Sequence, residues 1–205
     1  MGRWFVPPKS SPYHHGSLRA ELLDLAQKRI EETGAAGLSL RELAREIGVS
    51  HGAPQRHFAD KQALLDALAV RGLDELGELS EARIGACEDG GFDRRLLAFA
   101  HAYVDFATAH PVLLSLIFAR KDSESSPELR AANERAFAAP QRMISDALRA
   151  GDIVDDFERV SMSVLATIQG LATIIGNGMI GNRPPEVVVA GTVGTLIAGL
   201  RAGPV

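Results

Sequence analysis

One short stretch of the sequence places hydrogen-bonding side chains beside residues with almost no side chain. Imidazole and amide groups can pair with acceptors on guanine and adenine, and an alanine methyl can meet the methyl of thymine. We therefore expect this stretch to contact the edges of DNA bases through Ser50, His51, Gly52, Ala53 and Gln55. The side-chain amide of Gln55 can bind either the edge of an adenine base or a phosphate. For Gln55 we prefer the phosphate contact.

A second group of residues carries a charge or a hydroxyl near the expected start of a helix. Such groups bind phosphate oxygens without reading base sequence. The candidate contacts to the DNA backbone are Ser39, Arg41, Arg56, His57 and Lys61. For Arg41, the alternative is an ordinary solvated charge on a helix surface.

Two helices joined by a tight turn would position these side chains. Apolar residues at 40, 43, 44 and 47 form one helical face. Ser39 and Glu42 have the spacing of a capping box, and Gly48 stands where a helix closes in the left-handed conformation. A short helix is then expected over residues 50–58, with its first residues in the major groove of DNA. This pattern predicts a helix-turn-helix.

The flanking segments also have helical periodicity. Apolar residues recur at intervals of three and four from Leu18 to Ile30, and Gly34 ends that helix. Asp60 is a suitable N-cap for a long helix that continues past Leu76 and joins the N-terminal part to the rest of the chain. The N-terminal part is therefore expected to contain three helices and the start of a fourth.

The remaining residues predict a helical body. The chain is 46% hydrophobic but only 5% aromatic, which favours packed helices over a β-sandwich. Pro140 should kink or divide one helix near Phe137. The predicted fold class is all-α, with an N-terminal three-helix head joined to a larger helical bundle. Body helices are expected over residues 92–109, 111–119, 126–149, 156–181 and 186–201.

Charge is distributed unevenly along the chain. Residues 1–61 carry 9 Lys+Arg and 7 Asp+Glu, and residues 62–205 carry the remaining 13 and 19 of the totals of 22 and 26. The overall net charge of −4 argues weakly against a nucleic-acid partner. A head with a net charge of +2 on an acidic body nevertheless has the right sign for DNA binding.

The helix-turn-helix segment resembles the TetR family of bacterial regulators. The motif runs from Leu40 through Leu43-Ala44 and Ile47-Gly48-Val49-Ser50 to Gly52, His57-Phe58, Asp60-Lys61 and Leu64-Leu65. A second stretch common in such regulators is His110-Pro111 followed by Leu113 and Leu116-Ile117-Phe118. One departure is Gln55, because many family members have a tyrosine there that contacts a phosphate.

The resemblance implies a homodimer whose two heads read the half-sites of a palindromic operator. It also implies that the last two helices of each subunit form the dimer interface and that the body binds a small-molecule effector. The expected domains are an arm over residues 1–16, a DNA-binding domain over 17–61, and a ligand-binding and dimerisation domain over 62–205. The arm is expected because residues 1–16 contain three prolines and little periodicity. Arg3 and Lys9 could touch DNA there, but the interpretation that we prefer is a tail without such contacts.

A ligand cavity in the body should be mostly apolar with a few polar anchors. The candidate lining residues are Tyr103, Phe106, Phe118, Met143, Met162, Gln169 and Thr173. For each of them, a place in the ordinary hydrophobic core is the alternative.

Two apolar segments near the C-terminus raise the question of a membrane. Residues 161–180 contain no charge and are long enough to span a bilayer. Their polar side chains and glycines make a poor hydrocarbon helix, so we expect no membrane span. We expect instead a helix buried on most sides, against the Gly- and Ala-rich residues 190–199.

Other functions lack support in the sequence. No Gly-rich phosphate loop or metal-ligand spacing is present, so we expect no metal, no cofactor and no enzyme, although His101 and His110 are the candidate acid-base groups for that alternative. Cys87 is the single cysteine, and the first residues lack a long apolar run, which favours the cytoplasm. A DNA-binding adaptor whose body binds a protein is the other alternative to a ligand-responsive repressor.

Overall fold

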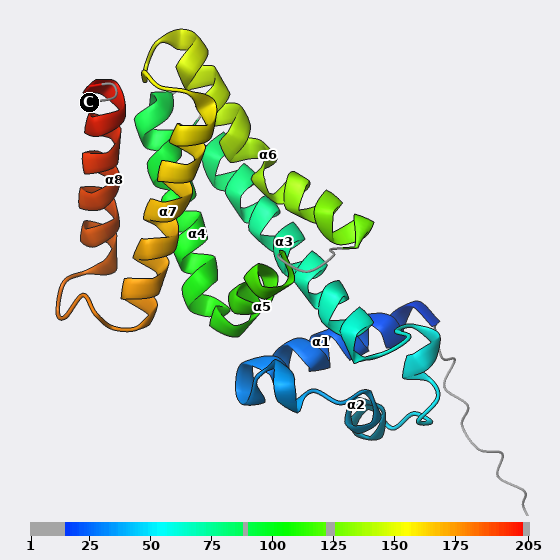
Figure 1. Ribbon diagram of the computed structural model, residues 1–205. Coiled ribbons are helices and arrows are strands. Elements are labelled where there is room, and N and C mark those ends of the chain that lie inside the picture. The colour runs from blue at the N-terminus through cyan, green and yellow to red at the C-terminus, as the bar shows by residue number, and fades with distance from the viewer. Residues whose placement is uncertain (1–14, 88–89, 122–125, 203–205) are drawn as a thin grey trace, which may run out of the picture. The chain divides into compact units, whose positions relative to one another are not determined.

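The computed structural model describes residues 15–87, 90–121 and 126–202, and each regular element in these ranges is a helix (Figure 1). The all-α prediction is confirmed. The elements are α1 (His15–Thr33), η1 (Ala35–Gly37), α2 (Leu40–Ile47), η2 (Pro54–Arg56), α3 (Lys61–Gly85), α4 (Gly91–Ala109), α5 (Pro111–Lys121), α6 (Pro127–Ala150), α7 (Phe157–Gly176) and α8 (Pro185–Ala202).

The chain forms two compact units that divide between Leu64 and Leu65, so α3 begins in the first unit and continues in the second. Residues 1–14 of the predicted arm, with Arg3 and Lys9, lie outside the described residues. Residues 15 and 16 belong to α1 rather than to an arm.

The first unit is built on the apolar face of α1, which packs against α2, η1 and η2. Leu22, Ala26 and Ile30 on this face are fully buried. Gly34 follows the helix with a φ of 75°, and its amide bonds the carbonyl of Ile30 at 2.8 Å. Because a positive φ is low in cost only for glycine, Gly34 ends α1 as the sequence predicts.

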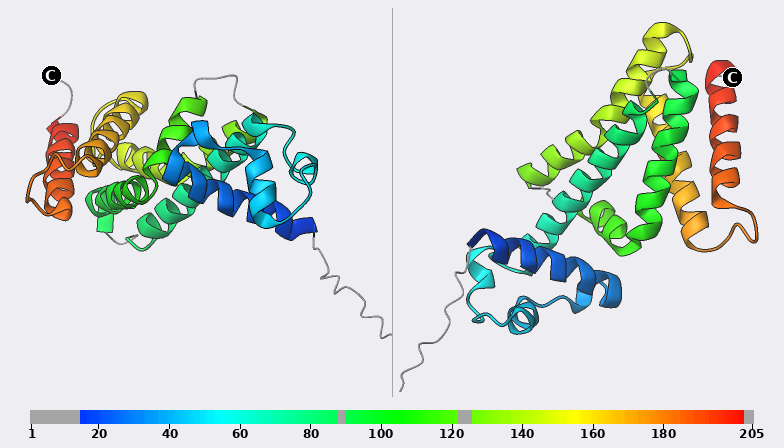
Figure 2. Two further views of the ribbon diagram at one scale, coloured as in Figure 1. Left: turned by 90° about the horizontal axis from the view of Figure 1, so that it is seen from below. Right: turned by 180° about the vertical axis from the view of Figure 1, so that it is seen from behind.

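Helix α4 is central to the second unit. It packs against α5, α6, α7 and α8, and α7 also contacts both α6 and α8. Both views in Figure 2 show α7 and α8 running beside each other. The largest buried side chains of α4 are Phe92, Leu96, Phe99 and Tyr103, which recur every three or four residues and so line one face of the helix.

Glycines allow α3 to approach its neighbours closely. A Cβ atom at Gly77 would lie 2.9 Å from Cα of Ala136 on α6, closer than packed atoms can come. Two ion pairs flank this crossing: Asp74 with Arg135 and Glu81 with Arg142, each with a closest N···O distance of 2.7 Å. Helix α6 is therefore held against α3 by a backbone approach and by charge.

Two expected features of the body helices differ in the structure. Helix α6 is continuous through Pro140, so the proline does not divide it, although it leaves the carbonyl of Ala136 without its usual helical donor. Helix α7 ends at Gly176, earlier than residue 181, because Gly178 and Gly181 adopt positive φ.

Candidate nucleic-acid interface

The end of α2 fixes the turn that leads into the candidate base-reading stretch. Gly48 has a φ of 81°, and its amide reaches the carbonyls of Ala44 and Arg45. The amide of Val49 also bonds the carbonyl of Ala44, at 2.9 Å. This paired arrangement satisfies carbonyls at the helix end and reverses the chain, as the sequence predicts.

Residues 50–58 do not form the regular short helix that we expected. The structure has a turn, then the single 3-10 turn η2, then another turn before α3. Pro54 has no N–H and cannot make the α-type bond to the carbonyl of Ser50, so Ala53 bonds that carbonyl instead, at 3.0 Å. The amides of His57 and Phe58 both bond the carbonyl of Pro54, at 2.9 Å.

Two buried side chains anchor this stretch to the first unit. Pro54 and Phe58 are buried, and Arg19 of α1 lies over the ring of Phe58, with its guanidinium carbon 5.3 Å from the ring centre. Phe58 is thus a core residue. Because residues four apart in a helical turn share a face, the residues between these anchors are turned outward.

The five candidate base contacts lie together on this stretch. Ser50, His51, Gly52 and Gln55 are exposed, and Ala53 is half-buried. A Cβ at Gly52 would meet no atom within 4 Å, and its φ is not positive. Nothing within the described protein therefore requires glycine at this position.

The five candidate backbone contacts surround the same stretch. Arg41 and Arg56 are exposed, whereas Ser39, His57 and Lys61 are half-buried. Lys61 donates a hydrogen bond from Nζ to the carbonyl of Ala36, with an N···O distance of 2.7 Å. Its ammonium group therefore also holds the loop between α1 and α2.

The side chain of Ser39 does not make the bond expected of a capping box at the start of α2. Ser39 occupies the N-cap position, with extended φ and ψ angles of −140° and 120°, but its side chain makes no capping hydrogen bond. The hydroxyl is not used by the helix. In the same unit, Asp60 does cap α3, accepting a hydrogen bond from the amide of Ala63 at 2.8 Å.

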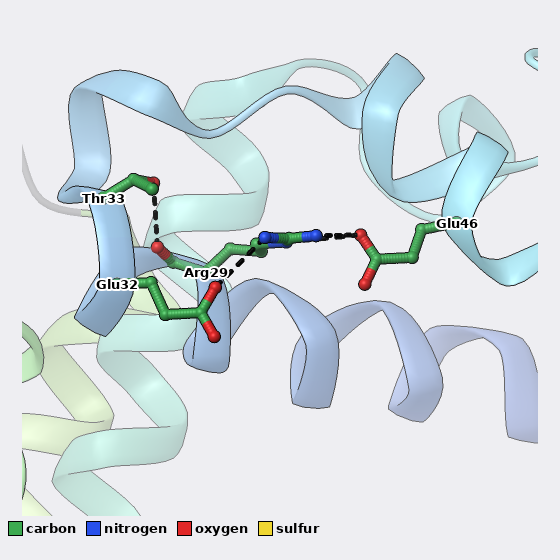
Figure 3. A network of polar contacts seen from close by, with 4 residues as sticks. All are labelled: Arg29, Glu32, Thr33 and Glu46. Atoms are coloured by element: carbon green, nitrogen blue, oxygen red, sulfur yellow. Dashed lines mark hydrogen bonds and ion pairs between the residues drawn. The ribbon is translucent and has the colours of Figure 1, made fainter.

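An ion-pair network sets α2 against α1 (Figure 3). Arg29 of α1 pairs with Glu46 of α2 at 2.6 Å and with Glu32 at 3.0 Å. The hydrogen bond to Glu46, followed by the charges of both carboxylates, raises the pKa of Arg29 above its usual value. The hydroxyl of Thr33 bonds the carbonyl of Arg29 at 2.9 Å.

One candidate contact was missed from the sequence. Arg45 is exposed and lies four residues after Arg41, so both side chains share one face of α2. Among the described residues, Arg41, Arg45 and Arg56 have no carboxylate within salt-bridge distance, whereas Arg29 has two. The four-residue spacing of two arginines beside the motif was the signal for Arg45.

The seven residues expected to line a ligand cavity are scattered in the second unit. Tyr103, Phe106 and Met143 are buried core residues, while Met162 is 64% exposed. Phe118 and Gln169 are half-buried, and Thr173 is exposed. Tyr103 and Gln169 do meet, through a hydrogen bond between their side chains. A cavity between α4, α6 and α7 exists, but none of the seven residues lines it.

We expected the apolar segments of α7 and α8 to be buried on most sides, and this prediction is wrong within one chain. Only 28% of the most apolar window of α7 and 22% of that of α8 is buried within the chain. Both helices have the length and hydropathy that a membrane span requires. Their outer faces include Met162, Thr167 and Leu196, and an open groove runs between them. Exposed apolar surface of this kind is typical of an interaction site.

The structure also shows the surroundings of the two histidines that we considered as acid-base groups. His101 and His110 are both half-buried, and His110 packs its ring against Phe106 at 5.4 Å. In the described ranges, no group of three or more His, Cys, Asp or Glu side chains is close enough to hold a metal ion.

Two protein-family models match the chain. "Bacterial regulatory proteins, tetR family" matches residues 22–68, and "Tetracyclin repressor-like, C-terminal domain" matches residues 96–193. Among curated proteins, an HTH-type transcriptional regulator of Mycobacterium bovis is 27% identical over 143 residues, which cover 68% of this chain and 59% of that protein. The chain thus spans less than two thirds of the length of this relative.

Solved structures are similar over nearly the whole chain. A protein of unknown function from Rhodococcus sp. RHA1 is 41% identical with a TM-score of 0.86, covering 94% of this chain and 100% of that one. The TetR family transcriptional regulator PfmR from Thermus thermophilus is 20% identical with a TM-score of 0.66, covering 87% and 98%. At 20% identity, the similarity to PfmR shows a shared fold.

Proposed function

This chain belongs to the TetR family of bacterial transcriptional regulators, and we propose that it is a repressor that binds a palindromic DNA operator as a homodimer and responds to a small molecule. The observation that carries the DNA part of the proposal is the mostly exposed stretch over residues 50–57, which lies before and between the anchors Pro54 and Phe58. It presents Ser50, His51 and Gln55 outward while the anchors hold it on the first unit.

In this proposal the stretch enters the major groove, which is wide enough to accept a helical segment. Ser50, His51, Gly52 and Ala53 face the bases, and Gln55, the fifth candidate, contacts a phosphate through its side-chain amide. Gly52 supports this placement. Packing within the protein does not require glycine there, because a Cβ atom would meet no other atom within 4 Å, whereas the lack of a side chain allows the backbone to come close to DNA.

Phosphate contacts come from the surrounding groups. The guanidinium groups of Arg41, Arg45 and Arg56 are exposed and unpaired among the described residues, so binding phosphate breaks no internal salt bridge. The hydroxyl of Ser39 is likewise not used to cap α2, and a helix N-terminus favours an anion. His57 and Lys61 complete the set that we propose.

The dimer part of the proposal is supported by the glycines of α8. Gly191, Gly194 and Gly199 lie within the helix, and a Cβ at each would meet nothing within 4 Å. Glycine inside a helix costs about 1 kcal/mol relative to alanine, with no benefit inside this chain. Small residues do allow two helices to approach closely, so we propose that α7 and α8 of a second copy cover these faces.

A second copy also explains why the operator should be palindromic. A two-fold dimer presents the same stretch to each half-site, and the two half-sites mirror the symmetry of the protein. The apolar faces of α7 and α8 are then buried between subunits rather than in lipid. A cytoplasmic location follows for a protein of this function.

Selection of bound duplexes from random DNA tests the DNA proposal. We expect a palindromic consensus, and anisotropy titrations should show at least about a thousandfold preference for it over random competitor. A variant of two base-facing residues, Ser50→Ala with His51→Ala, should lose the preference without loss of fold. Recovery of no consensus would contradict the proposal.

Light scattering after size exclusion tests the dimer. Thr195 is exposed on α8 and lines the groove, so Thr195→Arg should give monomers. Ser115 is exposed on α5, and Ser115→Arg serves as the matched control that should remain dimeric. A wild-type monomer at micromolar concentration, or an unchanged dimer in Thr195→Arg, would count against this interface.

A further inference from the structure

The cavity between α4, α6 and α7 has a volume of about 140 Å³. Buried apolar side chains form most of its wall, among them Phe99, Ile144, Val164 and Ile168. An apolar cavity of roughly 150 Å³ is large enough to bind benzene. The volume therefore accommodates about one small ring.

The wall carries no charge. Among the described residues that line the cavity, none is Asp, Glu, Lys, Arg or His. An ion moved from water into such a site loses its hydration and gains no partner, which makes binding of charged molecules strongly unfavourable. An uncharged occupant avoids this cost.

One polar atom in the wall is without a partner. The hydroxyl oxygen of Ser161 is buried and has no hydrogen bond to any described residue. A serine within a helix often bonds the carbonyl four residues earlier, and Ser161 does not. A buried polar group left unpaired lowers stability, so a ligand group that pairs with it gains affinity. The amides of Asn133 and Gln141 are the other polar groups at the wall.

We propose that this cavity binds a small, uncharged, mainly apolar molecule with one ring, whose single hydroxyl or carbonyl group hydrogen-bonds the hydroxyl of Ser161. The inference rests on the proposed function, in which such a molecule is the effector, and it names the chemical class.

The position of the cavity suits an effector. Phe137 and Pro140 of α6 form part of its wall. The same helix is ion-paired to α3 through Arg135 and Arg142. An occupant that displaces α6 therefore acts on the helix that continues into the DNA-binding unit. A ligand changes this equilibrium only if it binds the two arrangements unequally.

The test uses the full chain without DNA and four probes of one ring size: benzyl alcohol, toluene, benzoate and benzylammonium. Binding is measured by calorimetry or by ligand-observed NMR. We expect benzyl alcohol to bind about three- to tenfold more tightly than toluene, the effect of one hydrogen bond. The two ions should show no saturable binding.

Three variants locate the site. Ser161→Ala should reduce the preference for benzyl alcohol over toluene to within about twofold, and Ser115→Ala, a control on α5, should leave it unchanged. Leu165 also lines the cavity, and Leu165→Trp should fill it and abolish binding of both neutral probes. Circular dichroism checks the fold of each variant, and Ser161→Ala decides the question alone if Leu165→Trp does not fold.

Equal binding of benzoate or benzylammonium, or an unchanged preference in Ser161→Ala, overturns the inference. No binding of any probe overturns it as well. Anisotropy on selected operator DNA is measured separately. If the chain binds the selected operator but none of the four probes, only this inference is contradicted. If the chain does not prefer the selected operator over random DNA, the proposed function is contradicted.

Discussion

Tyr103 of α4 donates a hydrogen bond from its hydroxyl to the side-chain oxygen of Gln169 on α7. The tyrosine is fully buried, and Phe99 packs edge-on against its ring at 6.3 Å between ring centres. Burial raises the pKa of Tyr103 well above its usual range, because the charged phenolate would lose its hydration. The contact thus joins two helices through a group that must stay protonated.

This contact makes stability depend on alkaline pH. Below a pH of about 10, tyrosine is protonated in both the folded and unfolded chains, and the stabilisation is fully present. As pH rises further, the unfolded chain loses the proton while the folded chain keeps it, so the free energy of unfolding falls. Tyr103→Phe should cost about 1 kcal/mol at pH 8 and show a smaller decrease from pH 8 to 11 in urea unfolding. An identical decrease in both proteins would contradict this account.

Gly52 and Gly48 should respond oppositely to alanine. Gly52 has an ordinary φ and open space, so Gly52→Ala should change the free energy of unfolding by less than about 1 kcal/mol. The same change should weaken operator binding about tenfold, because the added methyl stands between backbone and DNA. Gly48→Ala, at a φ of 81°, should instead cost about 1–2 kcal/mol of stability. Chemical denaturation and anisotropy separate the two effects.

Arg56 should contribute charge rather than sequence preference. Arg56→Ala should weaken binding to all duplexes and reduce the slope of log affinity against log salt by about 1.8, or roughly 0.9 for each of two phosphates per dimer. Arg149→Ala, which removes an exposed arginine that pairs with Asp146 of its own helix in the second unit, is the control for net charge. An unchanged slope in the Arg56 variant would rule out a phosphate contact there.

Gln55 tests the departure from the family's tyrosine. Loss of preference at a single base pair in Gln55→Ala would support bidentate binding of adenine, while a uniform loss of affinity would support a phosphate contact. We expect the uniform loss. Titrations against the selected operator and its single-base variants distinguish the two.

Local signals explain most of what could be predicted from the sequence. Gly34, Gly48 and Asp60 end or begin helices through their own backbone or side-chain bonds, so the ends of α1 and α2 and the start of α3 follow from single residues. The all-α class and the family also follow from such signals. Pro54 shows where these local signals fail. The motif predicted a regular helix over residues 50–58, but Pro54 has no N–H to make the hydrogen bond that such a helix requires.

Positions set by tertiary packing could not be predicted in the same way. Helical periodicity assigns Tyr103 and Met143 to an inward face, but it does not say whether that face meets a cavity or another helix. The structure places the cavity beside Phe99 and Ile144, each near one of these residues in sequence. The unused hydroxyl of Ser39 likewise depends on a side-chain rotamer that the spacing to Glu42 does not determine.

The sparse coverage of α7 and α8 within one chain has a consequence for folding. If the missing cover is a second copy, these helices complete their cores only on association, and stability follows mass action. The thermal midpoint should then rise with protein concentration, and dilution alone should loosen the C-terminal helices. How much regulator is present would then determine how much of it is folded.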